Sequence, residues 1–341
     1  MSRTKVNLRI ETLRGLACLL LVLYHVIGAD ASFGLGLHDG VMRRFNDGLV
    51  YLRMPLFTFL SGLVYGLRPF AGDSRAFLLG KARRLLIPML VVGTLFALLQ
   101  TVTRGASALL GPWYLIHLLP VAHYWFVESL FWVFVLMWVL ERRDFIATPA
   151  GFGLVLTLTC AIYLTVRGPH WLGIEGAIYL LPYFLVGLAV SRFSLRNLLV
   201  VPGVRLALVL LALGSVVMMG MPMPNPDRRT VTMLLAGVSL CLLLVSSSLL
   251  IPRLAWVGRY SFSIYLFHVF FTAFARLALT ALKVDELLFH ILLGLALGVA
   301  GPIVLEQFVL RYKWPALLLL GRTVQPSNRS GTGADVAVTV Y

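Results

Sequence analysis

Ten runs of about 20 mostly apolar residues fill most of this 341-residue chain, and they limit its fold more than any other feature. A helix needs about 20 apolar residues to cross the hydrocarbon core of a bilayer. Because lipid offers the backbone no hydrogen bonds, such runs must form helices that satisfy their own. We therefore predict an all-α, polytopic membrane helix bundle with about ten transmembrane helices. The runs occupy residues 10–30, 48–67, 85–103, 121–140, 152–166, 171–191, 204–221, 231–251, 261–282 and 288–310.

Composition and charge agree with a membrane protein. The chain is 60% hydrophobic and 13% charged, whereas soluble domains are about 45–50% apolar and about 25% charged. The net charge of +15 has two readings, nucleic-acid binding or a surplus of Lys and Arg in cytoplasmic loops. With the N-terminus in the cytoplasm, 19 of the 29 basic residues fall on the inner side and 7 on the outer side. This bias predicts that both termini face the cytoplasm and that the protein lies in the cytoplasmic (inner) membrane. It also explains the net charge without a nucleic-acid partner, so we expect none.

We predict that residues 1–320 form one membrane domain. Residues 321–341 are polar and rich in Gly and Ser, so we predict that they form a disordered cytoplasmic tail. The basic start, the apolar run and Ala29-Asp30-Ala31 also fit a secretory signal with a cleavage site. The apolar core is long for a signal, and Glu11 and Arg14 lie within the helical pattern, so a retained first helix is favoured. The three cysteines lie in apolar runs without CxxC spacing, so we expect no disulfide and no metal site.

The first predicted helix carries the most informative polar residues, Glu11, Arg14 and His25. Charged side chains are costly inside a bilayer, so such residues are functional candidates. Eleven positions separate Arg14 from His25, which is close to three helical turns, so both lie on one face about 16 Å apart. A snorkelling interfacial arginine and a histidine that hydrogen-bonds between helices are the structural alternatives.

Other polar residues lie at compatible depths in the predicted bundle. Arg53 enters from the outer side and is expected near the level of His25, whereas Tyr265 and His268 are expected near the level of Arg14. Lys81 and Arg84 stand three apart in a basic loop, where they either set topology or bind a polyanion. Buried polar packing is the alternative for the remaining candidates: Glu128 and Glu175 in the outer half, and Glu306 near the cytoplasmic end of the last helix.

Several segments resemble a known family. ETLRGLACLLLVLYH, which holds Arg14 and His25, resembles the opening of the acyltransferase-3 family, integral-membrane enzymes that O-acylate extracytoplasmic glycans. PLFTFLSGLVYG, which includes Ser61, resembles the second-helix segment of that family. KARRLLIP is similar to its cytoplasmic RxxR element, with Lys81 in place of the first Arg. YWFVESLF, VGRYSFSIYLFH and VLEQF resemble three later segments, so the resemblance spans about residues 8–312.

The resemblance implies a membrane O-acyltransferase that moves an acyl group, most commonly acetyl, from cytoplasmic acyl-CoA to a hydroxyl of an extracytoplasmic or lipid-linked polysaccharide. It implies acyl-CoA as donor substrate, no permanently bound cofactor, and contact with membrane lipid. A separate extracytoplasmic transferase is a further partner that it allows. Depth in the bundle and the resemblance together give four groups of candidate residues: His25 as base or acyl carrier with Arg53; Arg14, Lys81, Arg83, Arg84, Tyr265 and His268 for the donor; Trp125, Glu128 and Glu175 for the acceptor; and Glu11, Ser61 and Glu306 in support.

A transporter or exporter of polysaccharide or lipid is the alternative function, because buried Arg, Glu and His also line substrate pathways. Many transporters are built from two similar halves, and this sequence shows no such internal symmetry. A transporter would also have no need to bind CoA. The two functions therefore differ in a measurable property, the affinity for the acyl donor.

Overall fold

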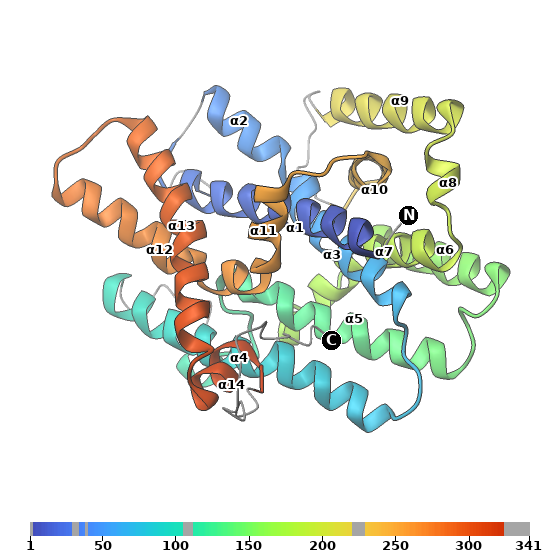
Figure 1. Cartoon of the computed structure of the whole chain (residues 1–341), viewed down its shortest axis with the longest axis horizontal. Coiled ribbons are helices and arrows are strands. Elements are labelled where there is room, and N and C mark those ends of the chain that lie inside the picture. Colours follow the sequence, from blue (N-terminus) through green and yellow to red (C-terminus); the bar gives the residue numbers. More distant parts are fainter. Residues whose placement is uncertain (1–2, 29–33, 38–39, 105–111, 220–228, 324–341) are drawn as a thin grey trace, which may run out of the picture.

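The structure, a computed structural model, describes residues 3–28, 34–37, 40–104, 112–219 and 229–323. Within these ranges the regular secondary structure is helical, and there is no β-strand. This confirms the predicted all-α bundle (Figure 1). Most of the predicted tail, from residue 324 on, lies outside the described residues, so its disorder stays a prediction.

Each of the ten predicted runs coincides with a helix. The α-helices are α1 (Arg3–Ile27), α2 (Val41–Gly48), α3 (Val50–Leu67), α4 (Ser74–Arg104), α5 (Trp125–Arg142), α6 (Pro149–Thr165), α7 (Ile174–Arg192), α8 (Arg196–Leu199), α9 (Pro202–Met219), α10 (Val231–Ser246), α11 (Pro252–Arg259), α12 (Ser261–Ala281), α13 (Leu287–Val309) and α14 (Lys313–Leu320). Short 3-10 turns η2 (Trp113–Leu115), η3 (Ala122–Tyr124) and η4 (Trp171–Gly173) precede α5 and α7.

Seven segments in the described part of the chain are long and apolar enough to cross a membrane. Three further apolar helices, Pro149–Thr165, Pro202–Met218 and Val231–Ser246, are shorter. The chain is thus a multi-pass membrane protein, while ten crossings and cytoplasmic termini stay predictions. The seven long segments are Leu8–Ile27, Val41–Leu67, Ser74–Val102, Ala122–Arg142, Trp171–Arg192, Ser261–Ala281 and Leu287–Val309.

Two boundaries differ from the sequence prediction in ways that matter for function. Helix α4 begins at Ser74 rather than at residue 85, so Lys81, Arg83 and Arg84 lie on a helix and not in a loop. The short helix α11 starts with Pro252 in its first turn and ends before Tyr260. The sequence pattern does not predict α11, because its eight residues, PRLAWVGR, are too few and too polar to form an apolar run.

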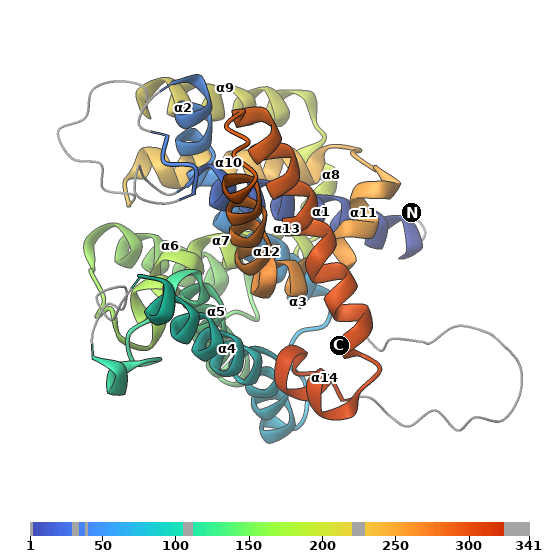
Figure 2. The ribbon, with the colours of Figure 1, turned by 90° about the vertical axis from the view of Figure 1, so that its left-hand side faces the viewer.

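Helix α1 lies inside the bundle, packed against α3, α11, α12 and α13 (Figures 1 and 2). Gly258 of α11 lies against the backbone of Glu11 and Gly15, near the start of α1. Helices α12 and α13 form an extensively packed pair, and α4 lies beside α5. The polar face of α1 that holds Arg14 and His25 is therefore enclosed by protein rather than turned to lipid.

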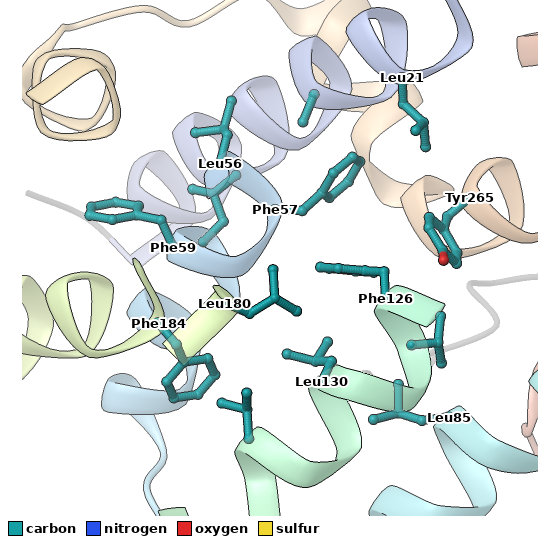
Figure 3. Close-up of a cluster of buried hydrophobic side chains, with 14 of the residues drawn as sticks. Leu21, Leu56, Phe57, Phe59, Leu85, Phe126, Leu130, Leu180, Phe184 and Tyr265 are labelled. Carbon is teal, nitrogen blue, oxygen red and sulfur yellow. The ribbon is translucent and has the colours of Figure 1, made fainter. Parts of the chain in front are cut away.

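A continuous apolar core joins α1, α3, α5, α7 and α12. Figure 3 shows Phe57 of α3 on the side of Phe126 of α5 and Tyr265 of α12, whereas Leu56 and Phe59 lie farther from them, and Leu180 and Phe184 of α7 complete the cluster. The backbones of α3 and α7 approach so closely that a Cβ at Gly187 would lie 2.0 Å from the Phe59 carbonyl oxygen. Small residues allow such close helix packing in membranes.

Candidate active site

A cavity of about 710 Å³ opens beside the C-terminal half of α1. Side chains from α1, α3, α4, α12 and α13 line it, together with the η3 turn before α5. Its apolar wall carries Leu21, Phe96, Val269 and Phe270 among others. Polar side chains line it as well, among them His25, Arg53, Gln100, His123, Arg276 and His290. An apolar cavity with a few polar groups of this kind is the usual form of a small-molecule site.

Three histidine rings from different segments form a cluster, in which His25 and His123 line the cavity and His268 is buried beside them. The ring centroid of His25 (α1) lies 4.6 Å from that of His268 (α12) and 5.4 Å from that of His123 (η3). The His123 and His268 centroids are 5.1 Å apart, and all three pairs are edge-to-face. No group of three or more His, Cys, Asp or Glu side chains in the described residues is arranged to hold a metal ion.

Backbone carbonyls fix which nitrogen of each ring carries a proton. Nδ1 of His25 lies 3.2 Å from the Leu21 carbonyl oxygen, and Nδ1 of His268 lies 2.8 Å from that of Ile264. A neutral imidazole donates from its protonated nitrogen, so both rings keep a lone pair on Nε2. Within the described residues Nε2 of His25 has no hydrogen-bond partner, and Nε2 of His268 is buried without one. His25 thus presents a basic nitrogen at the cavity wall.

The third histidine is held by a reciprocal pair of bonds to α12. The Tyr265 hydroxyl donates to the His123 carbonyl oxygen, and His123 Nε2 lies 3.2 Å from the Tyr265 carbonyl oxygen. The neighbouring Tyr124 hydroxyl donates to the Leu266 carbonyl oxygen at 2.9 Å. These contacts fasten η3 to α12 and leave Nδ1 as the lone-pair nitrogen of a neutral His123.

Arg53 is 3% exposed and reaches the cavity level with His25, as the sequence predicts. Its guanidinium carbon lies 4.0 Å from the centroid of the Tyr24 ring, next to His25 in α1. Its Nη1 donates to Asn46 Oδ1 at 2.9 Å, and its Nη2 donates to the Asn46 carbonyl oxygen at 2.8 Å. Asn46 Nδ2 in turn donates to the Gly28 carbonyl oxygen at 3.1 Å. Helix α2 thereby links the end of α1 to the cation on α3.

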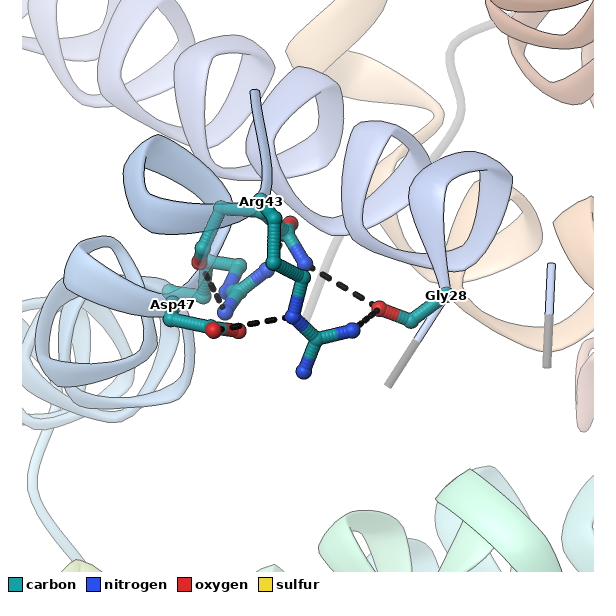
Figure 4. Close-up of polar contacts among 5 residues, drawn as sticks. Gly28, Arg43 and Asp47 are labelled. Carbon is teal, nitrogen blue, oxygen red and sulfur yellow. Dashed lines mark hydrogen bonds and ion pairs between the residues drawn. The ribbon is translucent and has the colours of Figure 1, made fainter. Parts of the chain in front are cut away.

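The same end of α1 is held by a second contact from α2. Figure 4 shows Arg43 bridging Asp47 and the Gly28 carbonyl oxygen. The distances are 2.9 Å from Nε to the Asp47 carboxylate and 3.4 Å from Nη1 to Gly28. Because Arg43 and Asn46 share one acceptor, α2 closes over the C-terminal end of α1 through a polar network.

Three turns toward the other end of α1 lies a cluster of cations. Arg14 forms an ion pair with Glu11 at 2.9 Å. Lys81 Nζ lies 4.0 Å from the centroid of Phe134, and the Arg84 guanidinium carbon lies 5.6 Å from that of Phe262. Arg83, between them, is exposed. The structure therefore separates Arg83 from the interior face that Lys81 and Arg84 share.

Comparison with known proteins decides the family. The sequence profile of the acyltransferase-3 family, described as an acyltransferase domain, matches residues 7–307. The chain belongs to the acyltransferase-3 family. No curated protein and no solved structure matched it. The match spans both α1 and the helices that surround it, so the protein is a membrane acyltransferase rather than only an exporter.

Within this acyltransferase, the expected depth of Tyr265 and His268 is wrong. Both were expected near Arg14, yet His268 touches His25. The physical reason is where α12 starts, because Phe262 lies beside Arg84 and Ser263 donates to Glu306, so the first turn of α12 is level with the cations around Arg14. Two turns later His268 reaches the level of His25. A role of these two residues at the phosphates of a donor loses its geometric basis.

The predicted acceptor residues separate in the structure. Trp125 lines the cavity, whereas Glu128 and Glu175 are not among the described residues that line it. Glu128 is 5% exposed and packs against Gly173, and Glu175 forms an ion pair with Arg229. Of the supporting residues, Ser61 donates to the Phe57 carbonyl oxygen of its own helix at 2.8 Å.

Sequence reasoning missed several residues that line the cavity of the acyltransferase. His123, Arg276, Gln100 and His290 face it from four separate segments. His123 and Arg276 are ionisable residues inside apolar runs, and that signal alone could have added them to the site. Gln100 and His290 carry no such signal, because they lie near helix ends where polar residues are ordinary.

Proposed function

We propose that this acyltransferase moves an acyl group, with acetyl the expected one, from acyl-CoA on the cytoplasmic side to a hydroxyl of an extracytoplasmic or lipid-linked polysaccharide. The observation that carries the proposal is His25. Its Nδ1 is tied to the Leu21 carbonyl oxygen, and its ring lines a 710 Å³ cavity with Nε2 as the lone-pair nitrogen. A base so oriented, with a pKa near neutrality in its free form, suits removal of a hydroxyl proton.

The reaction can be written with the groups at the cavity. Nε2 of His25 takes the proton of the acceptor hydroxyl while that oxygen attacks the thioester carbonyl. The carbon–sulfur bond then breaks, and the departing thiolate takes the proton from the imidazolium. General-base catalysis of this kind contributes about 10²- to 10⁴-fold. Transfer through an acyl-imidazole on His25 is the second route, with the same overall balance.

Arg53 is proposed to stabilise the oxyanion or to hold the glycan. Its guanidinium lies at the cavity and is fixed by two bonds to Asn46, so little reorganisation is needed when charge develops. The donor phosphates would bind about 16 Å away, at Arg14, Lys81 and Arg84, where the cations gather. A long, thin thioester arm can then run along α1 from the cations to His25.

The test is transfer of labelled acetyl from acetyl-CoA to isolated surface polysaccharide by the purified protein. His25→Ala is expected to abolish transfer, whereas His170→Ala, an exposed histidine away from the cavity, is expected to retain it. Thermal unfolding in detergent checks that both variants are folded. Full turnover by a folded His25→Ala variant would show that His25 is not the base or acyl carrier.

A further inference from the structure

The C-terminal helix α14 lies beyond the residues that match the family, which end at 307, yet it packs against α4 (Figure 1). It brings residues 321–322 to the cation cluster. A Cβ at Gly321 would lie 2.4 Å from the Arg83 carbonyl oxygen and 2.8 Å from the Arg84 Cα atom. The end of α14 thus rests directly on the helical turn that carries Arg84.

The turn after α14 fixes the direction of Arg322. Gly321 has a φ of 62°, in the left-handed region that glycine adopts readily. The Gly321 amide donates to the Leu317 carbonyl oxygen, and the Arg322 amide donates to that of Ala316 at 3.0 Å. The bond from the left-handed Gly321 to Leu317, four residues back, is the αL arrangement that ends many helices. Arg322 is therefore held by the backbone rather than by its side chain alone.

The side chain of Arg322 turns inward to a buried carboxylate. Its Nη1 lies 2.5 Å from Glu306 Oε1, and the two side chains are 14% and 3% exposed. Ser263 Oγ donates to the other carboxylate oxygen of Glu306. Nε of Arg322 is buried and has no hydrogen-bond partner in the described part of the chain. A buried N–H group without an acceptor is costly, so this one points to an acceptor that a ligand supplies.

Positive charge exceeds negative charge around Arg322. Arg84 lies close enough to Arg14, Arg322 and Glu306 for their charges to interact. Glu306 and the Glu11 partner of Arg14 are two carboxylates against these three guanidinium groups. Half-buried cations in excess favour a bound anion, and guanidinium groups pair with phosphate oxygens through two parallel bonds.

We propose that Arg322, carried by α14 outside the matched acyltransferase domain, is a phosphate-binding residue of the donor site. It completes a phosphate cradle with Arg14 and Arg84, and Glu306 and Ser263 hold it in place before the donor arrives. The inference rests on the proposed acyl-CoA donor. It extends the donor site beyond the family domain and assigns a function to the C-terminal helix.

The experiment measures binding of CoA itself to the purified full-length protein by titration calorimetry in detergent. Loss of a charged hydrogen bond to phosphate predicts that Arg322→Ala raises the Kd about tenfold or more. Arg311→Ala removes an exposed cation near the same end of the bundle and is expected to leave the Kd unchanged. Arg322→Lys keeps the charge beside Glu306 but lacks the planar fork, so an intermediate Kd is expected.

The outcomes separate this inference from the proposed function. If the wild-type protein binds no CoA, the proposed donor is wrong. If it binds CoA and Arg322→Ala binds equally well, or if Arg311→Ala weakens binding to the same degree, Arg322 is not a phosphate ligand. Should Arg322→Ala fail to fold, the same comparison is made with Arg322→Lys, which overturns the inference if its Kd equals that of the wild type. Dephospho-CoA then shows whether the lost contact is to the 3′-phosphate or the pyrophosphate.

Discussion

Asn46→Ala is the sharpest test of how the catalytic cavity is held together. Asn46 is fully buried on α2, and its side chain accepts from Arg53 Nη1 at 2.9 Å and donates to the Gly28 carbonyl oxygen at 3.1 Å. The substitution removes both bonds. It leaves the second bond of Arg53, to the backbone carbonyl oxygen of residue 46, and the Tyr24 ring 4.0 Å away.

The size of the effect follows from what is lost and what remains. A hydrogen bond to a charged group contributes about 1.5–3 kcal/mol, and about 1.4 kcal/mol is a factor of ten. Because Arg53 keeps one backbone acceptor and its aromatic neighbour, we expect a loss near the lower end of this energy range. We expect Asn46→Ala to lower kcat/KM by about tenfold, whereas Arg53→Ala, which removes the cation itself, should cost about 10²- to 10³-fold.

The assay is acetyl transfer by the wild type, both single variants and the double variant, which together form a double-mutant cycle. If Asn46 acts by positioning Arg53, Asn46→Ala should not lower kcat/KM further in a protein that already carries Arg53→Ala. If Asn46→Ala lowers kcat/KM by the same factor with and without Arg53, Asn46 does not act through Arg53. Arg44→Ala, an exposed cation on the same helix, serves as the matched control and should leave kcat/KM unchanged.

Two further predictions concern stability. Gly187→Ala should lower the midpoint of thermal unfolding, because its Cβ would meet the Phe59 carbonyl oxygen at 2.0 Å; Gly153→Ala, in open space on α6, should be neutral or stabilising, and equal effects would contradict the packing argument. Burial lowers the pKa of His117, whose Nε2 lies 2.8 Å from the Thr94 hydroxyl oxygen, below its ordinary value of 6.5. The unfolded chain therefore binds more protons below pH 6.5, and stability falls as the pH falls through this range. His117→Gln should flatten that dependence in unfolding midpoints measured between about pH 5 and pH 7.5, and an unchanged slope would show that His117 does not cause it.

Apolar length predicts most of the fold, because every long run must become a helix in lipid. It misses α11 and α14, which are eight residues each and carry no long run. Helix α11 packs against α1 and leads directly into α12, and α14 brings Arg322 to Glu306. The meeting of Arg53 with His25 was predictable from depth alone, because both lie near the same end of their spans. The meeting of His268 with His25 was not, since it depends on how helices pair.

Counting charge by loop cannot separate a cation that sets topology from one that binds a ligand, but burial can. Arg83 and Arg84 are neighbours in sequence and count equally toward the positive-inside bias. Arg83 is exposed, so its charge stays hydrated at no cost. Arg84 is drawn inward beside Phe262, and Lys81 lies over Phe134, where desolvation must be offset by aromatic faces or by an anion. A charge that only set topology would have no reason to leave water, so we propose that the inward pair, and not Arg83, is the part of the basic segment that binds an anionic ligand.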